Sequence, residues 1–119
     1  MKILFRDDIV RAQCTGLKAA LKLFGGDRKM AVSLLARIYA IETADVIKDI
    51  ILTPTFRFHA LKGGFSGFFA MDVKSSRDKW RIILQPLDEN GKPFVPCHID
   101  EIAAIVRIVE IREVSPHYE

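Results

Sequence analysis

Three side chains that suit phosphodiester chemistry lie within one stretch of this sequence. His59 and Lys62 belong to the segment Phe58–Gly63, and Arg81 follows Trp80 later in the same stretch. The imidazole of histidine, with an ordinary pKa of ~6.5, can accept or donate a proton near neutral pH. Lysine and arginine neutralise phosphate charge, and arginine can bind two phosphate oxygens at once. The same residue types are common on protein surfaces, so the fold decides whether they form a site.

Positive charge is concentrated around these residues. The whole chain has a formal net charge of +3 and a pI of about 9.0. Residues 57–81 alone contain six Lys or Arg against two Asp, so the rest of the chain is slightly acidic. A local excess of this kind permits a polyanionic partner without requiring one. The two acids of the stretch, Asp72 and Asp78, are expected to be solvated.

Length and composition favour one soluble domain covering residues 1–119. Half of the residues are hydrophobic, which is enough for a core and too many for wholesale disorder. No signal peptide is recognisable, and the longest run without a charged side chain, Gly63–Met71, is far shorter than the ~20 apolar residues of a membrane span. Cys14 and Cys97 form no CxxC motif, and Cys97-His98 is too small a set for zinc. We therefore expect a cytoplasmic protein with reduced thiols, no metal, no cofactor and no membrane partner.

Helical periodicity occupies the first half of the chain. Apolar residues three and four positions apart predict a helix from Asp8 to Phe24, ended by Gly25-Gly26. Asp27 can cap a second helix, whose apolar stripe consists of Met30, Leu34, Ile38 and Ile41. A shorter helix is expected over Ala44–Ile50, before Pro54. The two longer helices should form an antiparallel hairpin.

The period changes to two after these helices, which indicates strands. We expect a short extended segment at Thr55–Ala60 and strands at Phe68–Val73, Lys79–Leu87 and Ile105–Val114. The regular alternation of the last strand predicts that it is partly buried on both faces. Helices followed by strands indicate an α+β fold, with an N-terminal helical hairpin packed on a twisted antiparallel sheet.

Several segments carry a resemblance to a known family. They are Leu35–Ala44, Phe56–Gly63, Gly67–Val73, Trp80–Ile83 and Ile108–Val114. In order and spacing, from about residue 30 onward, the chain resembles the RelE/ParE superfamily of bacterial type II toxins, in its HigB-like (plasmid maintenance killer) branch. The His-x-Leu-Lys-Gly element followed by Trp-Arg-Ile is specific as a pair, whereas either element alone is weak.

The resemblance implies a RelE-like fold and a toxin that cleaves messenger RNA without a metal, usually on the translating ribosome. It also implies a cognate antitoxin encoded in an adjacent gene. In this branch the antitoxin tends to be a helix-turn-helix DNA-binding protein, and the complex represses its own operon.

Metal-independent RNA cleavage assigns a role to each candidate catalytic residue. The ribose 2′-OH attacks the phosphorus while a base accepts its proton, cations stabilise the phosphorane and an acid protonates the 5′-oxygen. His59 can be the acid or the base, and Lys62 and Arg81 suit the anionic transition state. His117 and Tyr118 can supply the second proton-transfer group. RNA contacts are expected from Arg57, Lys74, Arg77, Lys79 and Trp80, although packing is the alternative role for the indole.

The end of the chain departs from the family pattern. The family often ends in Asp-Tyr-His, whereas this chain has Ser115-Pro116-His117-Tyr118. Because neighbouring strand residues point to opposite faces, His117 and Tyr118 are not both expected to reach the site, and Pro116 can end the strand and let either one turn in. Two other functions therefore stay open. One is a gyrase-targeting ParE-like toxin without nuclease activity, and the other is a catalytically degenerate module that only binds its antitoxin.

Overall fold

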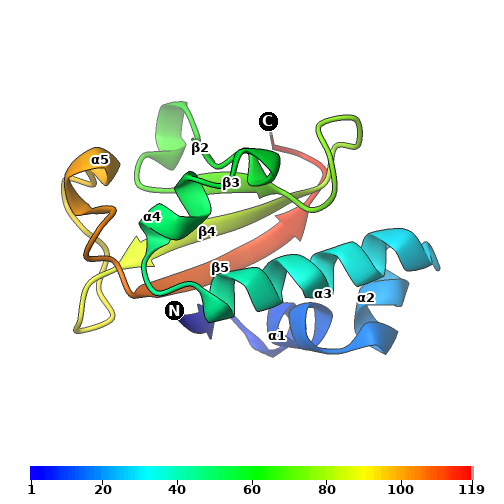
Figure 1. Ribbon diagram of the computed structural model, residues 1–119. Helices are drawn as coiled ribbons and strands as arrows, with labels where there is room; N and C mark the ends of the chain where they lie inside the picture. The colour runs from blue at the N-terminus through cyan, green and yellow to red at the C-terminus, as the bar shows by residue number, and fades with distance from the viewer. Residues whose placement is uncertain (119) are drawn as a thin grey trace.

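One five-stranded sheet runs through the structure, a computed structural model that describes residues 1–118 (Figure 1). Its strands lie in the order β1-β5-β4-β3-β2, with bounds β1 Lys2–Phe5, β2 His59–Ala60, β3 Phe69–Asp72, β4 Arg81–Leu87 and β5 Ile108–Ser115. The α+β class predicted from the sequence is confirmed. The sheet is mixed rather than antiparallel, because β1 pairs in parallel with β5 while the other neighbours are antiparallel.

Five α-helices and two 3₁₀ turns complete the described chain. Their bounds are α1 Asp8–Thr15, α2 Leu17–Leu23, α3 Arg28–Thr43, α4 Ile47–Ile51, α5 Ile99–Ile102, η1 Pro54–Phe56 and η2 Gly63–Phe65. The predicted helix from Asp8 to Phe24 is wrong in one respect, because Gly16 is extended and divides it into α1 and α2. Asp27 caps α3 as expected, accepting a hydrogen bond from the Met30 N–H. Among the described residues, no helix is long and apolar enough to cross a membrane.

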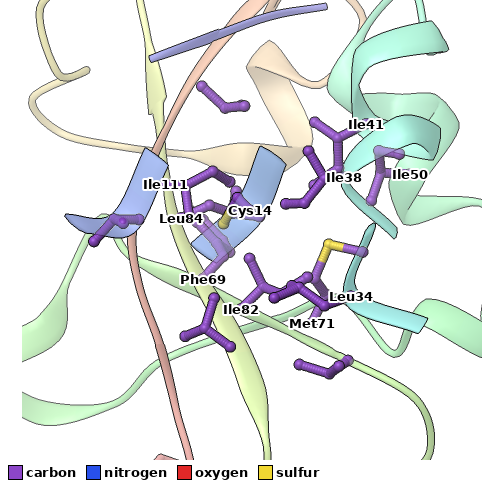
Figure 2. Close-up of a cluster of buried hydrophobic side chains, with 14 of the residues drawn as sticks. Cys14, Leu34, Ile38, Ile41, Ile50, Phe69, Met71, Ile82, Leu84 and Ile111 are labelled. Atoms are coloured by element: carbon purple, nitrogen blue, oxygen red, sulfur yellow. The ribbon is translucent and has the colours of Figure 1, made fainter. Parts of the chain in front are cut away.

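The core lies between the helices and one face of the sheet (Figure 2). The predicted stripe of α3 is confirmed, since Leu34, Ile38 and Ile41 are all buried. They meet apolar side chains from the central strands, namely Phe69, Met71, Ile82, Leu84 and Ile111. Each fully buried side chain of this size contributes about 1.5–3 kcal/mol relative to its exposed state. The helical layer therefore fixes which face of the sheet is left for a site.

A β-bulge in β5 changes which residues occupy that remaining face. Ile83 of β4 pairs with Glu113, whereas the next residue, Leu84, pairs with Ile111, so Arg112 is the extra residue. An extra residue shifts the side-chain alternation by one position. Val109, Ile111 and Val114 are therefore all buried in the core. The prediction that β5 is only partly buried on each face is therefore wrong for the core face, while Ile108, Glu110 and Glu113 on the other face are half-buried as expected.

Candidate functional site

A hollow of about 410 Å³ lies on the sheet face opposite the core, where β4 begins and β5 ends. We call it the first hollow. Its lining comes from three distant parts of the chain, which meet because Arg81 is the cross-strand partner of Ser115. The lining residues are Arg57, Ser76, Lys79, Arg81, Pro116, His117 and Tyr118. Half of the ten candidate residues therefore line one concave site.

A buried carboxylate lies beside the first hollow. Asp72 has no exposed surface, and its Oδ2 lies 3.4 Å from Nη1 of Arg57. Its Oδ1 lies 3.3 Å from Nε of Arg81, a side chain that is only 8% exposed. The expectation that Asp72 is solvated is wrong, because Asp72 and Arg81 are direct cross-strand partners and a buried charge requires a counter-charge.

The guanidinium of Arg81 is held in place mainly through its Nη1. This atom donates to the backbone carbonyls of Asp78 and Trp80 at 2.9 and 2.8 Å. Its Nε and Asp72 Oδ1 are close enough for an ion pair but poorly aligned, and neither atom has another hydrogen-bond partner. None of the hydrogen bonds found within residues 1–118 uses Arg81 Nη2. Because Arg81 lines the first hollow, its guanidinium lies beside the space where an anion would bind.

The loop between β3 and β4, residues 74–80, forms a braced ridge beside the first hollow. The carboxylate of Asp78 accepts hydrogen bonds from the Ser75 N–H at 3.1 Å and the Trp80 N–H at 2.8 Å. Arg37 of α3 donates from Nη2 to the Lys74 carbonyl at 3.1 Å. Asp78 is thus a structural residue with a half-buried side chain, and the expectation that it is simply solvated is wrong. These hydrogen bonds fix the backbone of the ridge, from which its Lys and Arg side chains project.

The segment that follows β5 brings two candidate residues to the first hollow. The strand ends at Ser115, and the Ser115 hydroxyl oxygen accepts the His117 N–H at 3.1 Å. His117 is exposed and Tyr118 is half-buried, and both line the hollow. Strand alternation does not separate them because neither residue belongs to the strand.

The phenol of Tyr118 lies between an aromatic ring and a carboxylate. Its ring meets the Phe65 ring edge-on, with the centroids 5.4 Å apart. Burial, followed by the negative charge of Glu113 and a hydrogen bond to its carboxylate, raises the pKa of the Tyr118 phenol above its ordinary value. The group stays protonated at neutral pH, as an ordinary phenol does, and the raised pKa makes it a weaker acid.

His59 shares the open face with Arg81 but does not line the first hollow. It is half-buried on β2, pairs with Ala70 of β3, and has its Nδ1 2.6 Å from the Arg57 carbonyl oxygen. One strand separates β2 from β4, so the two backbones are about 10 Å apart across the sheet. Lys62 is exposed immediately before η2 and also lies outside the hollow lining. His59 therefore lies on the same sheet face as Arg81, with one strand between them.

The remaining candidates line another concave surface, which the ridge also borders. This second hollow, of about 470 Å³, is lined by Asp27, Lys29, Met30, Lys74, Ser75, Arg77, Asp78 and Trp80. The indole of Trp80 is half-buried and packs edge-on against Phe24 at 4.8 Å. Packing of the indole is therefore confirmed, and one edge of the residue still lies at the hollow.

Sequence reasoning missed the residues that brace the site. Asp72, Asp78 and Arg37 touch several of the candidate residues, yet none was expected to take part. One signal was available for Asp72, which is an acid inside an otherwise apolar strand. Arg37 gave no signal, because its partners are backbone carbonyls at positions remote in sequence.

Metal-ligand geometry is not evident in this region. Within residues 1–118, no group of three or more His, Cys, Asp or Glu side chains could hold a metal ion. Neither the models of known protein families nor the sequences of curated proteins match this chain. The chain is thus described by its own structure, which is an α+β domain. Its concave site on the cationic face is suited to an anionic ligand.

Proposed function

We propose that this chain is the toxin of a type II toxin-antitoxin pair and cleaves messenger RNA on the ribosome without a metal ion. The observation that carries the proposal is the first hollow. Three cations, Arg57, Lys79 and Arg81, meet two proton-transfer groups there, His117 and Tyr118. Cations beside a general acid are what an in-line attack on a phosphodiester requires.

The reaction removes one proton from the attacking 2′-OH and adds one to the leaving 5′-oxygen. The 2′-oxygen bonds to phosphorus as His59 accepts its proton, and the bond from phosphorus to the 5′-oxygen breaks. Tyr118, a neutral phenol that lines the first hollow, donates a proton to the leaving 5′-oxygen, with His117 as the neighbouring alternative. The products are a 2′,3′-cyclic phosphate and a 5′-hydroxyl. Lys62 and the cations of the hollow stabilise the phosphorane.

The proposal includes partners and a location. The substrate is messenger RNA on the ribosome, which places the reaction in the cytoplasm. The neutralising partner is an antitoxin with a helix-turn-helix domain, encoded beside the toxin. The cationic first hollow suits an acidic antitoxin segment, since complementary charge favours association.

Single substitutions test this function in growing cells. His59→Ala, Lys62→Ala and Arg81→Lys should each reduce the arrest of translation while the purified variants stay folded. Lysine at position 81 keeps the positive charge beside Asp72 but loses the planar guanidinium. Lys48→Ala, which removes an exposed cation of α4, is the matched control and should keep full toxicity.

The outcomes separate the alternatives. Full toxicity in all three folded variants refutes the nuclease. DNA damage with continuing protein synthesis points to a gyrase-binding toxin instead. A wild-type chain that is harmless yet binds its antitoxin is a degenerate module.

A further inference from the structure

We infer that the second hollow is a phosphate subsite, which binds the RNA strand after it has crossed the ridge from the first hollow. The identity of the polymer rests on the proposed function. The subsite itself rests on charge, on the shape of the ridge and on the position of one aromatic side chain.

The cations of the second hollow have no acidic partner. Lys29, Lys74 and Arg77 are exposed, and none forms an ion pair with a carboxylate within the described part of the chain. The two carboxylates of the lining are occupied by backbone N–H groups. Asp27 accepts the Met30 N–H at 3.2 Å, and Asp78 accepts those of Ser75 and Trp80. The lining of the second hollow therefore carries a formal net charge of +1, with three cations that form no ion pair among the described residues.

The two hollows are lined by residues of the same loop. Ser76 and Lys79 line the first hollow, whereas Ser75 and Arg77 line the second. Neighbouring residues of one short loop thus line both hollows, so an RNA strand that passes over this loop can contact both. Because Asp78 and Arg37 brace the loop, little conformational entropy is lost when RNA binds.

An aromatic side chain shares the second hollow with the cations. Trp80 is half-buried at the second hollow, and its neighbour Arg81 lines the first. An aromatic side chain beside cations is the usual combination in sites for single-stranded RNA. The second hollow should therefore accept a nucleotide of any base.

Binding of an uncleavable RNA tests this subsite apart from catalysis. The probes are a 2′-O-methyl trinucleotide and a 2′-O-methyl RNA of about 12 nucleotides, which covers the 39 Å longest extent of the protein at ~3.4 Å per nucleotide. The variants are Lys29→Gln and Lys74→Gln, with Lys48→Gln as a matched exposed lysine on α4. Dissociation constants are measured by fluorescence anisotropy across a range of salt concentrations.

The inference predicts a length-dependent loss of affinity. Each hollow variant should bind the longer RNA about fivefold more weakly at low salt, and the slope of its salt dependence should fall by ~0.7 for each phosphate that the variant no longer neutralises. The trinucleotide should show a smaller decrease, and Lys48→Gln should match the wild type. Wild-type affinity in both hollow variants, or equal decreases for both probes, overturns the subsite. Failure of the proposed function is a separate result, seen when unmodified RNA stays uncut by the wild-type protein.

Discussion

Replacement of Asp72 by asparagine should destabilise the fold and disorder the first hollow. The carboxylate of Asp72 has no exposed surface and is the common counter-charge of Arg57 and Arg81. Asparagine keeps the size of the side chain but removes its charge. Arg81, whose side chain is 8% exposed, is then left with Asp78, at 3.8 Å, as its remaining acidic neighbour.

The expected loss follows from the burial of this pair. Removal of one partner from a buried ion pair costs about 3–5 kcal/mol, because the other charge stays buried without compensation. Asp78 offsets part of this loss, so we expect about 3 kcal/mol, or a decrease of about 10 °C in Tm for a chain of this length. A pair at the surface contributes far less, usually below about 1 kcal/mol.

Urea unfolding monitored by circular dichroism measures the effect. The matched control is Glu101→Gln, which breaks the exposed pair with His98, where the two side chains are 76% and 62% exposed. Asp72→Asn should shift the unfolding midpoint strongly at an unchanged slope, and Glu101→Gln should not. A free energy of unfolding for Asp72→Asn within about 1 kcal/mol of the wild type would refute the role given to this carboxylate.

Three further outcomes are expected. Arg37→Lys should lower the free energy of unfolding by about 1.5–3 kcal/mol, because it removes charged hydrogen bonds to carbonyls of β3 and the ridge. Urea unfolding measures this loss, and an unchanged midpoint contradicts the bracing role of Arg37. Burial raises the pKa of the Cys14 thiol to about 12 from 9.0. In the folded protein at pH 8, Cys97 should therefore react with a thiol reagent long before Cys14, and equal reaction rates contradict this expectation. Since the unfolded chain ionises Cys14 at its ordinary pKa, this burial lowers stability progressively from pH 9 to about 12. Gly63→Ala should lower the free energy of unfolding by about 1 kcal/mol, because the backbone φ of Gly63 is +69° and an alanine there is strained. Gly64→Ala, at a position with no positive φ, should leave stability unchanged, and equal stability of the two variants in urea contradicts the strain at position 63.

Local signals in the sequence predicted the helical layer well. The stripe of α3 and the Asp27 cap depend on residues a few positions apart, which periodicity and capping chemistry capture directly. The strands β3 and β4 were also predicted to within two residues of their bounds. The break at Gly16 was missed because an isolated glycine is tolerated in many helices and the apolar spacing continues across it.

The remaining errors concern contacts between distant residues. The parallel pairing of β1 with β5 depends on how the chain crosses the helical layer, which no local pattern reveals. The bulge at Arg112 depends on a mismatch between two paired strands rather than on either strand alone. Asp72 was expected at the surface because an acid near several cations usually is, and only the pairing with β4 buries it against Arg81.

The candidate site was predicted as residue types rather than as an arrangement. Arg81 and the pair of His117 and Tyr118 meet in one hollow because β4 pairs with β5 and the strand ends at Ser115. His59 lies on the same sheet face, on β2, which β3 separates from β4. Whether these groups act together on RNA depends on the substrate.

Cleavage of a defined messenger RNA on purified ribosomes tests the central claim most directly. The purified protein is added to stalled ribosomes that carry either an all-ribose RNA or the same RNA with one 2′-deoxynucleotide at the cleaved position. The account predicts that the all-ribose RNA is cut to a 2′,3′-cyclic phosphate and a 5′-hydroxyl, and that the 2′-deoxy RNA stays intact. Equal cleavage of both RNAs, or none of either by the folded wild-type protein, would contradict it.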